Sequence, residues 1–257
     1  MPTVPPGYVL SRAFMLVCSL ILLANTYEVL YFQLTNLSIA QLVAQQLAKS
    51  DVRMTQRLMR LDIERMKLSN WLGYHVWPVP IWLFLSFWQT SSLIRRKWLW
   101  LHRVAGRGVL LLSLYMTFGY IMMFVTGEQI LGEEQFYIDF RNPSKFFTFR
   151  AATLVLTVWW FISAAKAYGY AKRRLVALHK YWAWQFLATG FAVGTMRIFM
   201  MLILLPWYPS NGERVLDKEE QDVLVGYTLW LAFFVSTCTA HLVVGREVAL
   251  GSNIKGK

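Results

Sequence analysis

The sequence predicts an all-α, polytopic membrane protein: a helical bundle with six transmembrane helices and one amphipathic surface helix. Composition points to this class, because 56% of the 257 residues are hydrophobic, 16% are aromatic and only 16% are charged. The apolar residues are also segregated into runs that match the roughly 20 residues needed to cross a hydrocarbon core of about 30 Å. In addition, basic residues gather at the ends of these runs, where they contact lipid headgroups.

The spans form a single expected membrane domain, residues 1–257. The first span contains Glu28 near its end, and the second contains Pro78 and Pro80, which should kink or loosen that helix because proline removes a backbone donor. The six expected spans cover residues 8–32, 71–94, 98–126, 147–170, 175–206 and 223–244.

A different pattern fills residues 33–70, between the first two spans. This segment contains no glycine or proline, and its apolar residues recur at helical spacing among arginines and lysines. It predicts a basic amphipathic helix that lies on the membrane surface or binds a protein partner.

Charge and cysteine content limit the expected partners and chemistry. The formal net charge of +12 does not indicate nucleic acid, because the bases lie beside apolar runs; we expect the lipid bilayer as the partner instead. Cys18 and Cys238 both lie inside apolar runs, which favours buried hydrophobic roles for them over a disulfide or a thiolate metal site.

A basic-histidine element occurs twice, in residues 95–103 and 172–180. Each copy has three basic residues, four mostly apolar residues ending in leucine, a histidine and another base, and each opens an apolar run. With six spans, both elements and both termini lie on one side of the membrane. The positive-inside rule predicts that this side is the cytoplasmic face, or the equivalent face of an organelle.

Three histidines, His102, His179 and His241, each lie five residues from a basic residue at a span end. A rise of about 1.5 Å per residue therefore predicts a shared layer about 7 Å inside the inner face. His102 and His179 are candidate ligands of a b-type haem, with Gly106 and Gly108 allowing close approach of a flat macrocycle, or all three could hold a metal. The alternatives are interfacial histidines bonded to carbonyls or lipid phosphates, and a proton or substrate path.

Further polar residues are expected within the bilayer. Arg107 and Arg197 each lie well inside a span, where an arginine costs about 3 kcal/mol or more and needs protein or water around it. Each could bind a haem propionate, a lipid phosphate or a substrate carboxylate, or could lock the fold by bonding to backbone carbonyls or Glu28. His75 lies alone near the opposite face and is either structural or part of a gate.

Residues between about 71 and 205 follow a specific order: a histidine, a glutamine at the end of that span, the motif His-Arg-x-x-Gly-Arg, tryptophan in the next span, a histidine near a tryptophan, and an arginine. The matching residues are His75, Gln89, His102, Gly106, Arg107, Trp159, Trp160, His179, Trp182 and Arg197. This order resembles the family of multi-pass membrane proteins called domain of unknown function 2306. The resemblance implies a helical membrane fold with His75, His102, Arg107, His179 and Arg197 in its core. It implies no reaction.

The leading functional hypothesis is therefore a haem-associated or redox membrane protein, with Arg107 as an electrostatic partner of the His102 and His179 pair. One alternative is a carrier for a small molecule or proton. The other is a non-catalytic subunit of a larger membrane complex, docked through residues 33–70. The sequence contains no phosphate-binding glycine-rich loop, no His-Glu-x-x-His and no nucleophile elbow, so no enzyme class is assigned.

Overall fold

The computed structural model describes residues 13–24, 26–27, 74–126, 149–207 and 218–254, and all regular secondary structure in these ranges is helical. Four of these helices are long and apolar enough to cross a membrane: Leu99–Met123, Ala151–Lys172, Val176–Ile203 and Leu224–Leu242. A shorter apolar helix covers Ala13–Ala24. The expected amphipathic helix at residues 33–70 and Glu28 lie outside the described residues.

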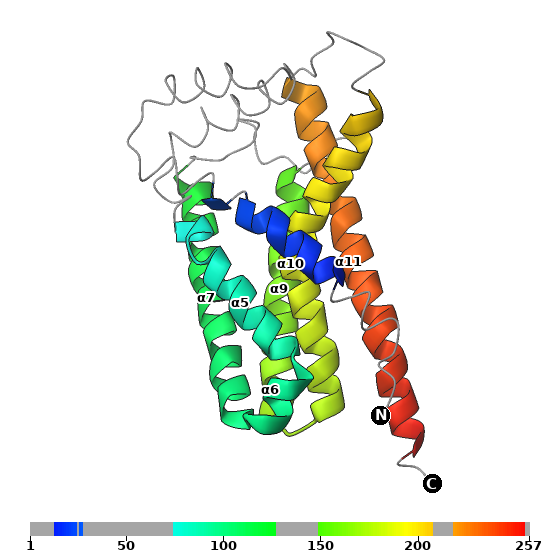
Figure 1. Cartoon of the computed structure of the whole chain (residues 1–257). Coiled ribbons are helices and arrows are strands. Elements are labelled where there is room, and N and C mark those ends of the chain that lie inside the picture. The colour runs from blue at the N-terminus through cyan, green and yellow to red at the C-terminus, as the bar shows by residue number, and fades with distance from the viewer. Residues whose placement is uncertain (1–12, 25, 28–73, 127–148, 208–217, 255–257) are drawn as a thin grey trace. The chain divides into compact units, whose positions relative to one another are not determined.

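The chain divides into two compact units. One consists of Met1–Ile21 and Phe136–Lys257, and the other of Leu22–Gln135. We call them the α9–α11 unit and the α5–α7 unit after their helices, and each is described separately (Figure 1).

The α5–α7 unit contains α5 (Val79–Thr90), α6 (Ser92–Lys97) and α7 (Leu99–Val125). The second expected span is interrupted here, because the chain is helical over residues 74–76, turns, and enters α5 with a proline in its first positions. Proline is tolerated there, since the first backbone N–H groups of a helix have no intrahelical partner. Ser91 then leaves helical geometry, with ψ of 116°, and separates α5 from α6. With 12 residues, α5 is about 18 Å long, which is shorter than the hydrocarbon core.

Helix α7 lies close to α5 and to the residues just before α5, because glycines line the facing side of α7. A Cβ atom built on Gly119 would lie 2.8 Å from the backbone nitrogen of His75, and one on Gly108 would lie 2.9 Å from a methyl carbon of Leu85. Nearby, the indole N–H of Trp82 donates to Ser113 Oγ over 2.8 Å. This interface combines small residues with a buried hydrogen bond, as is common between helices in membranes.

The α9–α11 unit contains α9 (Phe149–Lys172), α10 (Val176–Trp207) and α11 (Lys218–Ile254). Helix α10 packs against both neighbours (Figure 1). Apolar and small side chains form the core of this unit: Ala151, Ala152, Leu156, Ala192, Met196, Leu229, Trp230 and Ala232.

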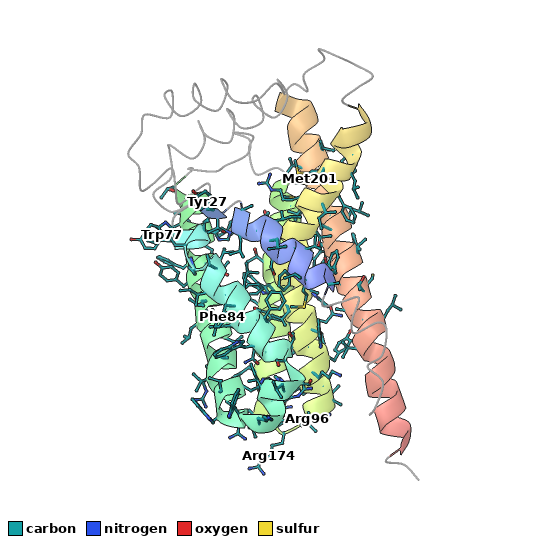
Figure 2. The ribbon with its side chains drawn as sticks, viewed as in Figure 1. Tyr27, Trp77, Phe84, Arg96, Arg174 and Met201 are labelled. Atoms are coloured by element: carbon teal, nitrogen blue, oxygen red, sulfur yellow. The ribbon has the colours of Figure 1, made fainter. Side chains whose placement is uncertain are left out.

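The turn between α9 and α10 is tight and basic. Leu175 N donates to Tyr170 O over 3.0 Å and Arg174 N donates to Ala171 O over 3.1 Å, the two bonds of a Schellman motif. Arg174 occupies the left-handed position with φ of 58°, at a cost of about 1 kcal/mol for a residue with a Cβ. The turn therefore holds exposed basic side chains at the tip of the helical hairpin, and Figure 2 labels Arg174 there.

Helix Ala13–Ala24 joins this unit through Cys18. The side chain of Cys18 is fully buried, and its Cβ lies 3.0 Å from the position of a Cβ on Gly194. Its predicted burial is thus confirmed. The same prediction is wrong for Cys238, which is exposed on α11 because its face of that helix is turned away from α10.

Candidate functional site

The best-defined histidine geometry in the α9–α11 unit belongs to His179, in the first turn of α10. Its half-buried ring places Nδ1 2.8 Å from the backbone oxygen of Ala167 on α9. A carbonyl oxygen can only accept, so Nδ1 carries the proton and Nε2 keeps its lone pair. Histidines that bind metals are usually held in this way, with one ring nitrogen donating to a carbonyl and the other facing the metal.

His241 on α11 makes a different contact. Its Nδ1 lies 2.9 Å from the hydroxyl of Tyr181, and the amide of Gln185 donates to that hydroxyl at 3.5 Å and to the backbone oxygen of Thr237 at 3.2 Å. We call Tyr181, Gln185, Thr237 and His241 the inner cluster. The Tyr181 hydroxyl accepts from Gln185 and shares a second hydrogen bond with His241 Nδ1, in which either group can be the donor.

The two histidines therefore bond to different neighbours, His179 to α9 and His241 to Tyr181 of α10. Tyr181 follows His179 by two residues, so their side chains leave α10 on nearly opposite sides. In the part of the chain that the structure describes, no group of three or more His, Cys, Asp or Glu residues could hold a metal ion.

Gln185 is the most unusual member of the inner cluster. Its side chain is 2% exposed, and its Oε1 has no hydrogen-bond partner among the described residues. Beside the cluster, Trp182 packs on Trp159, with ring centroids 5.9 Å apart, and carries the ammonium of Lys166 over its face at 4.1 Å. A buried amide with an open acceptor is rare and can accept a further hydrogen bond from water or another donor.

A second polar cluster lies deeper along α10. Thr195 Oγ1 lies 3.2 Å from Ser236 Oγ and 3.7 Å from Cys18 Sγ. Thr195 follows Gln185 by ten residues, or about 15 Å along the helix. On α10 the residues between the two levels include the buried apolar Phe191 and the buried Thr189, whose hydroxyl donates to Gln185 O over 2.8 Å. On α11 the two levels are adjacent, at Ser236 and Thr237.

In the α5–α7 unit, Gln89 holds the region of the His-Arg-x-x-Gly-Arg motif. Its side-chain amide donates to the backbone oxygen of His102, and its Oε1 lies 3.2 Å from the position of a Cβ on Gly106. Gln89 thus occupies the space beside Gly106, and Leu85 occupies the space beside Gly108. The sequence predicts that a flat macrocycle could lie in this space. The small residues after His102 serve helix packing in this unit and do not open a cradle for haem.

His75 lies at the other end of the same helix pair. Its Nδ1 is 2.9 Å from the backbone oxygen of Met116, and its ring centroid is 6.1 Å from that of Tyr120. Met116 follows His102 by 14 residues, or about 21 Å along α7. His75 and His102 therefore belong to separate sites within this unit.

The two arginines expected inside the bilayer differ in their surroundings. Arg107 is exposed on α7, whereas Arg197 is half-buried on α10. Neither makes a hydrogen bond or ion pair with a residue in the described ranges.

Sequence reasoning did not single out Tyr181, Gln185 or Gln89 as parts of a polar site. The signal for the first two was their spacing of four residues inside an apolar run, which places both on one face of α10.

Comparison of the chain with protein-family models, curated proteins and solved structures finds no match. The fold thus defines a helical protein with four candidate membrane-spanning helices.

Proposed function

We propose that the protein is a six-span membrane protein of the haem-associated, redox class, in which His179 would hold a b-type haem and His102 is the second ligand that the sequence predicts. The observation that carries this proposal is the hydrogen bond from His179 Nδ1 to the Ala167 carbonyl. It orients the ring and selects the tautomer in which Nε2 is the free donor of an electron pair.

The surroundings of His179 also fit such a group. The exposed basic residues Lys172, Arg173 and Arg174 lie in the turn just before α10, where they would pair with propionates. When bound, a haem would supply one-electron transfer at its iron. His102 enters the proposal through its equal expected depth alone. The packing around it argues against this second ligand, because Gln89 and Leu85 fill the space next to the glycines that follow it.

The test is an ultraviolet-visible spectrum of the detergent-purified protein, oxidised in air and then reduced with dithionite. We expect a Soret band with reduced-state α and β bands, lost in His179→Ala and His102→Ala. The controls are His75→Ala and His241→Ala, which lie outside the proposed pair and whose spectra should keep these bands. His75 is the more stringent control, because its Nδ1 also contacts a backbone carbonyl, that of Met116. A folded preparation without visible bands, or bands that survive in His179→Ala, would refute the proposal.

A carrier of protons or small polar molecules is the alternative, since the inner cluster and the Thr195 cluster both join α10 to α11. Uptake into liposomes that is lost in Arg197→Ala would favour the carrier. A subunit role would depend on residues 33–70, which lie outside the described ranges.

We also propose that both termini lie on the cytoplasmic or equivalent face. The exposed bases of α6 and of the α9–α10 turn support this orientation. Membership of the family that the sequence resembles is likewise proposed, and it rests on the order of the matched residues in the sequence. Reporter fusions at each terminus test the orientation.

A further inference from the structure

The two sides of α7 differ in what they contact. One side carries Ala105, Val109 and Ser113, which are buried, and Ser113 bonds to Trp82 of α5. The opposite side is exposed along the helix. Its members are Trp100, Arg103, Val104, Arg107, Leu111, Leu114 and Phe118.

Arg103 and Arg107 form a pair on this exposed side. They are four residues apart, which places them one above the other about 6 Å apart along the helix axis. Both are exposed, and neither makes a hydrogen bond or ion pair within the described residues. Two guanidinium groups at this spacing repel each other unless an anion lies between them.

Arg103 and Arg107 lie inside the candidate span, and their long side chains can extend toward the headgroup region of a bilayer. Arg107 follows Leu99, the first residue of α7, by eight residues, or about 12 Å. Side chains on a helix point toward its N-terminus, so Arg107 extends toward Arg103 and the basic end of α7. Trp98 and Trp100 at that end are 50% and 65% exposed, as expected for tryptophans at the membrane interface.

We propose that Arg103 and Arg107 bind the phosphate of an anionic phospholipid, whose acyl chains lie along Leu111, Leu114 and Phe118. The guanidinium groups supply paired N–H donors with the geometry of phosphate oxygens. The exposed bases of α6, including Arg96 (labelled in Figure 2), add positive charge at the same end of the unit. This site needs no haem, and it gives Arg107 a partner that the described protein residues do not provide.

The test measures lipid binding to the purified full-length protein by native mass spectrometry, with phosphatidylglycerol and phosphatidylcholine as probes. We expect phosphatidylglycerol to bind more tightly, and Arg107→Gln or Arg103→Gln to weaken it about fivefold each. Arg107→Lys should be weakened less, because it keeps the charge but loses the paired donors. Arg173→Gln is the matched control for the loss of one exposed base in the other unit, and it should weaken phosphatidylglycerol binding less than either α7 variant does.

Equal binding of the two lipids, or full phosphatidylglycerol binding in both glutamine variants, would overturn the proposal. Displacement of bound phosphatidylglycerol by an equal concentration of inorganic phosphate would also overturn it, because the site would then bind a free anion. The glutamine variants must keep the wild-type melting temperature in phosphatidylcholine. If they melt at a lower temperature, Arg107→Lys is compared with wild type instead. Weaker phosphatidylglycerol binding in Arg107→Lys then supports the proposal, and equal binding overturns it. Because lipid binding is read without the visible spectrum, failure here is separate from failure of the haem proposal.

Discussion

Replacing Gly119 with alanine tests whether α7 and the residues before α5 meet backbone to backbone. The new Cβ would lie 2.8 Å from His75 N and 3.0 Å from Tyr74 C, so backbone atoms would have to move. Overpacking of this kind costs about 1–3 kcal/mol. The higher helix propensity of alanine returns about 1 kcal/mol, which leaves a net loss of up to about 2 kcal/mol.

The assay is reversible unfolding in mixed micelles, followed by circular dichroism. Gly169→Ala is the matched control, because Gly169 is also helical and a Cβ there would meet nothing within 4 Å. The control should be neutral or more stable than wild type by up to about 1 kcal/mol. If Gly119→Ala is as stable as Gly169→Ala, the close backbone contact described for the α5–α7 unit is incorrect.

Three further predictions concern other contacts. Trp82→Phe and Ser113→Ala should show a coupling free energy of about 1 kcal/mol in a double-mutant cycle, because each removes the same hydrogen bond; additive losses would contradict this. Arg174→Gly should raise the free energy of unfolding by up to about 1 kcal/mol by relieving the left-handed φ, whereas Arg173→Gly should lower it, as thermal unfolding can measure. Gln185→Leu should change stability by less than about 1 kcal/mol, since the hydrogen bonds that it loses are offset by removal of a buried, unpaired oxygen; a loss above about 3 kcal/mol would mean that this oxygen has a partner.

Hydropathy predicted the long apolar helices because a span is a local property of about 20 successive residues. The four candidate spans of the structure all fall on segments for which the sequence predicts one. The second expected span shows the limit of this reasoning. Its prolines were expected to disturb a continuous helix, but one of them lies at the start of α5, and Ser91 ends that helix after 12 residues. Average hydropathy does not register such a break, because the flanking residues remain apolar.

The sequence predicts a common depth for the three histidines, but it does not predict the direction in which each side chain points. Counting residues from the bases placed the histidines in one expected layer, yet the contacts of His179 and His241 depend on which side of α10 faces each neighbour. That choice depends on packing between helices distant in sequence. The role of Gly106 was misjudged for the same reason, since only the packing reveals that Gln89 covers it.

The contact between Cys18 and Thr195 joins residues 177 positions apart in the chain. At a synthesis rate of about 5–20 residues per second, the first helix is made roughly 9–35 s before its partner on α10 exists. During that delay the hydroxyl of Ser19 in this helix does not depend on α10, because it donates to Met15 O within its own turn. The hydroxyl of Thr26, just after the helix, likewise donates to Leu22 O. These local hydrogen bonds satisfy both hydroxyl groups before α10 has been synthesised.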